Sequence, residues 1–204
     1  MLQTDASGFV VKRAFSSEAH HVIISKDNIA TDEIKDSIRQ WLEEIPGKAV
    51  LLQPYVATLQ DIAELRVVVC DCNPVIAFAT KWRSDDRQDM DIKELHTLTQ
   101  GCDTGRFDRF NDPRVSNTHL DILPMALSMA SRTVRVLGAS GMPLAMVVAQ
   151  VDLALTADCE GLMVNEVHSA GMDFFFCHTD RAIDVVVAEA LRKWILRKAH
   201  LPLT

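Results

Sequence analysis

The chain has 204 residues, enough for one domain or for two small lobes that share a cleft. Hydrophobic residues make up 48% and charged residues 24%, a composition that excludes a disordered or fibrous protein. The formal net charge of -7 argues against a general nucleic-acid or acidic-membrane binder, because such proteins need clustered positive charge.

The cellular setting follows from the cysteines and from the missing apolar segments. Five cysteines, an odd number at irregular spacing, favour a reducing compartment over a disulfide framework. Residues 1–8 carry Asp5 and lack the apolar core of a signal peptide. No run approaches the roughly 20 apolar residues needed to cross a bilayer. We therefore expect a cytoplasmic protein whose partners include neither a membrane nor a nucleic acid.

Residues 1–53 predict a small α+β lobe. Three apolar runs, at residues 9–12, 21–24 and 49–53, predict strands. Between the second and third runs, apolar residues recur at helical spacing after Thr31, which is available as a cap together with Asp32. The pair Pro46-Gly47 is expected to end this helix.

Residues 54–204 predict a larger lobe. Strands at 64–71 and 75–82 are expected to form a hairpin around a turn at Asn73-Pro74. An irregular insertion with short helices is expected at about residues 84–117. Periodicity then predicts, in chain order, a helix at 120–137, a strand at 146–155, a tight turn at 158–161, a strand at 162–167 and a helix at 182–198.

The late hairpin carries the most informative polar residues. Glu166 and His168 are two positions apart, so both leave the same face of their strand, and a short turn places Asp152 on the neighbouring strand. Two adjacent carboxylates repel unless a cation lies between them. Magnesium suits this role, because it takes one or two carboxylates together with phosphate and water oxygens. The alternative is an exposed hairpin with solvated charges.

Weaker signals lie earlier in the chain. Lys12 ends a buried strand and precedes small polar residues, so it either reaches a phosphate or is an ordinary surface lysine. The segment Gln53-Pro54-Tyr55-Val56 is either a hinge whose backbone reads an adenine edge or a plain linker. Glu64 and Arg66 share one face of a strand, where the alternative is a solvated ion pair of little energetic value.

The order of these pieces resembles the ATP-grasp superfamily. The resemblance covers residues 9–176. This stretch is similar to the C-terminal ATP-binding portion of the superfamily's carboxylate–amine ligases. Leu162-Met163-Val164-Asn165-Glu166-Val167 is the sharpest match and Val50-Leu51-Leu52-Gln53-Pro54-Tyr55 the next. The resemblance implies a two-lobed α+β fold with antiparallel sheets, packed helices and a nucleotide cleft between the lobes.

The resemblance also implies roles for individual residues, with ATP and Mg2+ as cofactors. Nucleotide contacts fall to Lys12 at the phosphates, to Ser16 and Ser17 in the loop that covers them, to Gln53, Tyr55 and Val56 around the adenine, and to Glu64 at the ribose. Arg66 and Lys81 match positions that face the triphosphate. Asp152 and Glu166 match the magnesium ligands, and His168 stands where the family usually has asparagine.

Three departures from the family pattern accompany the resemblance. Gln150 replaces a basic residue that often lies two positions before the metal-binding aspartate. His168 offers a nitrogen, which suits magnesium less well than an oxygen does. The stretch before Phe9 leaves no room for the usual N-terminal substrate-binding domain, so we expect a homodimer or a partner chain to supply it.

The functional expectation is therefore a ligase, with its status as an enzyme left open. It would use ATP to activate a small carboxylate or peptide-like substrate as an acylphosphate, which an amine or similar nucleophile captures. One alternative is a small-molecule kinase that stops after phosphoryl transfer. Another is a non-catalytic nucleotide-binding or interaction module on the same scaffold.

Overall fold

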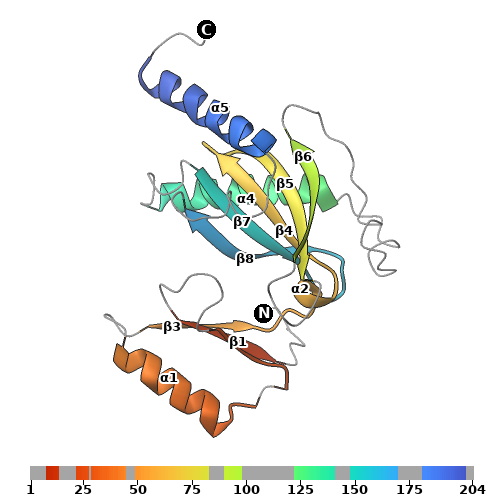
Figure 1. Cartoon of the computed structure of the whole chain (residues 1–204), viewed down its shortest axis with the longest axis vertical. Coiled ribbons are helices and arrows are strands. Elements are labelled where there is room, and N and C mark those ends of the chain that lie inside the picture. The colour runs from red at the N-terminus through yellow and green to blue at the C-terminus, as the bar shows by residue number, and fades with distance from the viewer. Residues whose placement is uncertain are drawn as a thin grey trace. The chain divides into compact units, whose positions relative to one another are not determined.

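A computed structural model describes residues 8–13, 22–27, 29–44, 49–82, 90–97, 122–140, 148–169 and 181–200. The chain divides into two compact units, Met1–Val56 and Ala57–Thr204, and both are drawn in Figure 1. Each unit is described by itself.

The N-terminal unit is built on three short antiparallel strands in the order β2-β1-β3. Their bounds are Phe9–Arg13 for β1, Val22–Ser25 for β2 and Val50–Pro54 for β3. Valine and isoleucine fill much of these strands, as is typical of pleated and partly buried segments. The three strands predicted from the sequence are confirmed.

Helix α1 (Asp32–Glu44) packs on one face of this sheet. The Thr31 hydroxyl oxygen accepts a hydrogen bond from the backbone N–H of Ile34 at 3.3 Å, the N-cap arrangement that the sequence predicts. Trp41 of the helix is buried against Val11 of β1. Because side chains alternate along a strand, Lys12 leaves the opposite face from Val11.

The C-terminal unit contains a five-stranded antiparallel sheet in the order β6-β5-β4-β7-β8. The strands are β4 (Glu64–Cys70), β5 (Asn73–Trp82), β6 (Met90–Thr97), β7 (Val148–Leu155) and β8 (Leu162–Ser169). The short helix α2 (Thr58–Asp61) precedes β4, and the Thr58 hydroxyl donates to the Leu155 carbonyl at 2.5 Å. This bond ties α2 to the end of β7.

Two helices pack on opposite faces of the large sheet (Figure 1). Helix α4 (Ile122–Ala139) packs its small apolar side chains on Val67 and Val151, in the larger of the sheet's two buried clusters. Helix α5 (Arg181–Lys198) contributes Ala190 and Leu191 to a cluster that includes Val68. Val67 and Val68 are consecutive, so they point to opposite faces. The face opposite α4 is therefore apolar where α5 packs, and it also carries the side chains of β4 that alternate with Leu65 and Val67.

The β4–β5 turn lies two residues earlier than predicted. Asp71 and Cys72 form it with positive φ angles of 49° and 62°, the conformation that two-residue hairpin turns favour, and Asn73 and Pro74 already belong to β5. Pro74 is tolerated there because it faces the register shift that follows Val68. The prediction of a turn at Asn73-Pro74 was therefore wrong.

Strand β6 was also missed, since the sequence predicts an irregular insertion with short helices at about 84–117. It pairs with β5 at the sheet edge, where charged residues are common and hide the apolar alternation of a strand. Residues 83–89 and 98–121 lie outside the described residues. In the part of the chain that the structure describes, no helix is long and apolar enough to cross a membrane.

Candidate functional site

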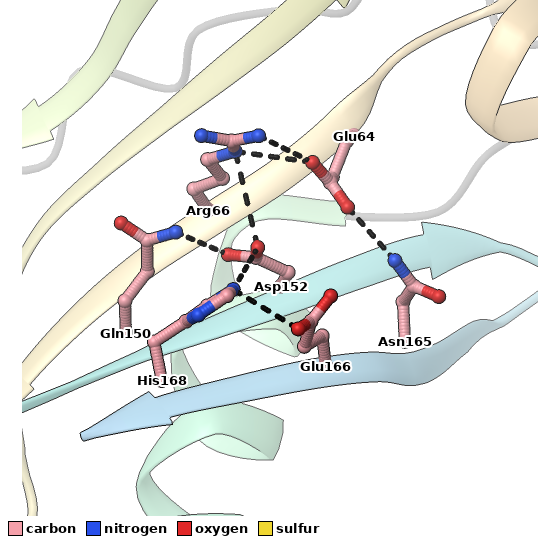
Figure 2. A network of polar contacts seen from close by, with 7 residues as sticks. All are labelled: Glu64, Arg66, Gln150, Asp152, Asn165, Glu166 and His168. Atoms are coloured by element: carbon pink, nitrogen blue, oxygen red, sulfur yellow. Dashed lines mark hydrogen bonds and ion pairs between the residues drawn. The ribbon is translucent and has the colours of Figure 1, made fainter. Parts of the chain in front are cut away.

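Three neighbouring strands of the large sheet place polar side chains together on the face opposite α4. Arg66 on β4 is the register partner of Asp152 on β7, and Asp152 is in turn the partner of Glu166 on β8. Partners on adjacent antiparallel strands point to the same face. The seven members of the polar network drawn in Figure 2 are Glu64, Arg66, Gln150, Asp152, Asn165, Glu166 and His168.

A register shift in the β7–β8 pair brings Asn165 into this network. Asp152 pairs with Glu166 but the next residue, Leu153, pairs with Val164, so Asn165 is the extra residue of a β-bulge. Its side-chain amide donates a hydrogen bond to Glu64 Oε1 at 2.9 Å, across the intervening strand β7. The bulge therefore adds a polar side chain that strict alternation would have turned away.

Asp152 is the buried centre of the network, with only 2% of the residue exposed. Its Oδ1 accepts a hydrogen bond from Gln150 Nε2 at 2.7 Å. Its Oδ2 lies 3.2 Å from His168 Nε2 and 4.0 Å from Arg66 Nε. The alternative of a solvated hairpin is thus wrong for this residue.

Glu64 and Arg66 form a second pair beside Asp152. Arg66 donates from Nε and Nη2 to Glu64 Oε2, at 3.0 and 2.9 Å. Burial, followed by the negative charge of Asp152, raises the pKa of Glu64, and Arg66 opposes part of this shift. Arg66 therefore compensates two carboxylates. Glu64 accepts hydrogen bonds from Arg66 and Asn165. Its predicted contact with the ribose stays a prediction.

His168 lies between two carboxylates. Its Nε2 is 3.2 Å from Asp152 Oδ2 and 3.7 Å from Glu166 Oε1. The hydrogen bond with Asp152 is the main cause that raises the pKa of His168, and burial opposes it. The His168 imidazole therefore lies between the two carboxylates, at the point where the sequence predicts a metal ion.

The carboxylates of Asp152 and Glu166 are ligands of the kind that magnesium prefers, but they are not arranged as a complete coordination site. Among the described residues, no group of three or more histidine, cysteine, aspartate or glutamate side chains is arranged to hold a metal ion. The oxygens of Asp152 and Glu166 nevertheless converge on one atom, His168 Nε2. Magnesium needs only one or two carboxylates when phosphate and water oxygens complete its octahedron. A cation that displaced the imidazole would meet both carboxylates.

The predicted phosphate and adenine contacts lie in the N-terminal unit. Lys12 on β1 and Gln53 on β3 share the face opposite α1, because Lys12 pairs with Leu51, two residues before Gln53. Tyr55 follows β3; its backbone N–H donates to the Gly8 carbonyl at 3.0 Å, and its ring lies 5.9 Å from Lys26 Nζ.

The structure describes fewer contacts for the remaining predicted site residues. Val56 follows Tyr55 and is half-buried. Ser16 and Ser17 lie outside the described residues, as does the side chain of Lys81, a β5 residue whose backbone pairs with Asp91 of β6. The prediction that Lys12 faces the acidic pair across a nucleotide cleft stays a prediction.

Sequence reasoning gave no role to two members of the network. Asn165 was part of the Asn-Glu motif, yet alternation assigns it to the face away from Glu166, and a bulge has no reliable sequence signal. Gln150 was noted only as a replacement for a basic residue. Its signal was available, because Gln150 and Asp152 are two apart on one strand and share a face.

No protein-family model matches the chain, and no curated protein matches it. Solved structures do match. D-cycloserine synthetase DcsG has a TM-score of 0.62 and 19% sequence identity, over 92% of this chain and 56% of that one. D-alanine–D-alanine ligase from Bacillus anthracis has a TM-score of 0.49 and 15% identity, over 95% of this chain and 56% of that one.

A further match is the ATP-grasp ligase PsnB, solved with a minimal precursor, Mg and ADP. It has a TM-score of 0.47 and 16% identity, over 91% of this chain and 47% of that one. The chain thus spans about half the length of these proteins. At such identities the likeness is one of fold, and it confirms the predicted α+β, ATP-grasp-like fold class.

Proposed function

From an ATP-grasp-like fold as the premise, we propose that this chain is an ATP- and magnesium-dependent ligase. The observation that carries the proposal is the meeting of Asp152 and Glu166 on one sheet face, with Asp152 almost fully buried. Burying a carboxylate beside a second one costs free energy unless a cation compensates the charge. A nucleotide that arrives with its magnesium supplies such a cation.

In this proposal Asp152 and Glu166 hold the magnesium ion, which when bound neutralises the charge on the phosphates. His168, which contacts Asp152 Oδ2, would have to leave that oxygen for it to hold the ion. An oxygen of each carboxylate lies near His168 Nε2. Magnesium and the His168 imidazole would therefore compete for Asp152 Oδ2.

We assign Arg66 and Lys81 to the phosphoryl group that is transferred. Glu64 takes two N–H groups of Arg66 and so fixes the plane of its guanidinium. A guanidinium has five N–H donors, and those not bound to Glu64 would meet phosphoryl oxygens. Such preorganised donors lower the barrier because they need no rearrangement during the reaction.

For the nucleotide itself we propose the contacts that the resemblance implies. Lys12 would contact the phosphates, and the shared face of Lys12 and Gln53 on the small sheet supports this assignment. The set is Lys12, Ser16, Ser17, Gln53, Tyr55, Val56 and Glu64.

The reaction follows from charge and position. An oxygen of the substrate carboxylate attacks the γ-phosphorus, and the bond from that phosphorus to the ADP oxygen breaks. An amine nitrogen then attacks the acyl carbon of the acylphosphate, loses a proton and expels phosphate. Neither step needs a protein nucleophile, in keeping with a site built of carboxylates and cations. We propose a small carboxylate or peptide-like substrate and a cytoplasmic location.

A non-catalytic nucleotide-binding module is the second candidate. Arg66, together with His168 when its imidazole is protonated, compensates the charge of Asp152 within the protein. A network that is balanced in this way is stable without a metal ion. A module that binds nucleotide and performs no chemistry needs no more than this.

Calorimetric titration with ATP and magnesium tests both candidates, together with ADP release across a panel of carboxylate and amine substrates. We expect magnesium-dependent ATP binding, ADP release that depends on both substrates, and loss of turnover in Glu166→Gln. Glu160→Gln is the matched control, because Glu160 is exposed in the β7–β8 turn.

The outcomes separate the two candidates. Binding without turnover across the panel would favour the module. No ATP binding at millimolar concentration would remove both, and equal loss of turnover in Glu160→Gln would show that the effect does not belong to the acidic pair.

A further inference from the structure

Gln150 is the most buried polar side chain of the network. It lies on β7 in register with Val68 on one side and His168 on the other, and only 1% of the residue is exposed. A buried primary amide needs partners for both its oxygen and its nitrogen. Gln150 lies between the apolar cluster that contains Val68 and the polar network around Asp152, so hydrogen-bond partners are available on one side only.

The orientation of this amide is fixed by Asp152. An ionised carboxylate only accepts hydrogen bonds, so the amide must turn its NH2 group toward it. Nε2 accordingly donates to Asp152 Oδ1 at 2.7 Å, while Oε1 has no hydrogen-bond partner in the part of the chain that the structure describes. Figure 2 shows Oε1 directed away from Asp152.

An unpaired buried acceptor costs stability. An apolar side chain of the same length would avoid that cost, so packing alone does not explain glutamine at this position. What glutamine adds is the hydrogen bond to Asp152. Polar groups that are kept at a cost are expected where function requires them.

The bond makes the two oxygens of Asp152 unequal. Oδ1 is held by Gln150, whereas Oδ2 is the oxygen near His168 and Arg66. Holding one oxygen sets the rotation of the carboxylate about its χ2 torsion, which is otherwise broad. The other oxygen thereby faces His168 Nε2, the atom that Glu166 Oε1 also approaches.

We propose that Gln150 is a positioning residue that fixes Asp152 so that Oδ2, and not Oδ1, is offered to the metal ion of the nucleotide. This inference rests on the proposed function, because it concerns the metal of that site. It gives Gln150 a role different from that of the basic residue it replaces. A basic residue would contact an anionic group, whereas this amide acts through the carboxylate.

Mn2+ binding in the presence of a non-hydrolysable ATP analogue, followed by electron paramagnetic resonance, tests the inference on the full chain. The variant is Gln150→Met, which keeps the length of the side chain and removes the donor. Loss of a residue that orients a metal ligand typically weakens metal affinity by about 10–100-fold. We expect at least tenfold weaker Mn2+ binding, with a urea midpoint close to that of the unmodified protein.

Thr80→Val is the matched control. Thr80 is also buried with an unpartnered hydroxyl, but it lies on β5, and β4 separates it from Asp152. Both substitutions remove a buried orphan atom, and only one removes a bond to Asp152. Mn2+ affinity in Thr80→Val should equal that of the unmodified protein.

The outcomes distinguish the inference from the function on which it rests. Mn2+ affinity in Gln150→Met within twofold of the unmodified protein overturns the inference and leaves the proposed function standing. Weak binding in both variants, or a large fall in the urea midpoint of Gln150→Met, overturns it in favour of a structural role. No Mn2+ binding by the unmodified protein overturns the proposed function and the inference together.

A measurement without any variant supplements this test. The Gln150 side-chain NH2 resonances are expected to be protected from exchange and to shift when Mg2+ and the analogue are added. Rapidly averaged resonances that do not respond would contradict the inference even if Gln150→Met failed to fold.

Discussion

Replacing Arg66 by methionine removes the cation that pairs with Glu64 and faces Asp152. Arg66 lies 2.9 Å from Glu64 Oε2 through Nη2 and 4.0 Å from Asp152 Oδ2 through Nε. The Arg66 and Glu64 side chains are 20% and 14% exposed, so water screens the pair only in part. Breaking a fully buried pair costs roughly 3–5 kcal/mol, and for this partly exposed one we expect a loss of about 2–3 kcal/mol.

Urea denaturation of Arg66→Met and of the double variant Glu64→Gln/Arg66→Met measures this loss. The double variant should recover at least half of it, because it no longer buries an unpaired Glu64 charge. The pH dependence has a definite sign. The pKa of Glu64 is raised in the folded state above its usual 4.5, mainly by burial and then by Asp152. The folded state therefore loses stability as pH rises from the usual pKa of 4.5 through the raised pKa of the folded state.

Arg66 lowers the pKa of Glu64, so its removal raises that pKa further. The defect of Arg66→Met should accordingly be smallest near pH 4.5, the usual pKa of a glutamate, and should grow as pH rises above it. A loss below about 0.5 kcal/mol, the size of an ordinary surface substitution, would refute the reasoning. So would a double variant that is less stable than Arg66→Met.

Three further predictions concern other contacts. The pKa of His168 should lie above 6.5 by NMR and fall in Asp152→Asn; the stability from this pair is present below about pH 6.5 and is lost as pH rises through the folded-state pKa. Gly8→Ala should destabilise the N-terminal unit by about 2–3 kcal/mol in thermal unfolding, because its Cβ would clash with the Ser25 carbonyl oxygen; an unchanged transition would contradict this contact. Thr31→Ala should cost about 1 kcal/mol through loss of the α1 cap, and an unchanged urea midpoint would show that the cap is not formed.

Much of the fold follows from local patterns. Thr31 and the apolar spacing after it predicted α1, and the alternation on either side of the turn at 158–161 predicted the β7–β8 hairpin. The same alternation placed Asp152 beside Glu166, because a tight turn leaves few registers open. These features depend on residues that are near one another in the sequence.

The missed features depend on contacts between residues far apart in the sequence, or on backbone conformations that several residue types adopt. The bulge at Asn165 is set by how β8 fits β7. The turn uses Asp71 and Cys72 in the left-handed region, where Asn-Gly would have been the clear signal. The role of Gln150 can be inferred only once the burial of Asp152 and its bond to Gln150 are known. A charged edge strand such as β6 has little apolar periodicity to detect.

A co-crystal structure with magnesium and a non-hydrolysable ATP analogue tests the central claim most directly. The account predicts a magnesium ion bound by Asp152 and Glu166 at about 2.0–2.1 Å, with phosphate oxygens in its coordination shell and His168 moved off Asp152 Oδ2. A nucleotide bound away from this sheet face, with Asp152 still paired to His168, would contradict it.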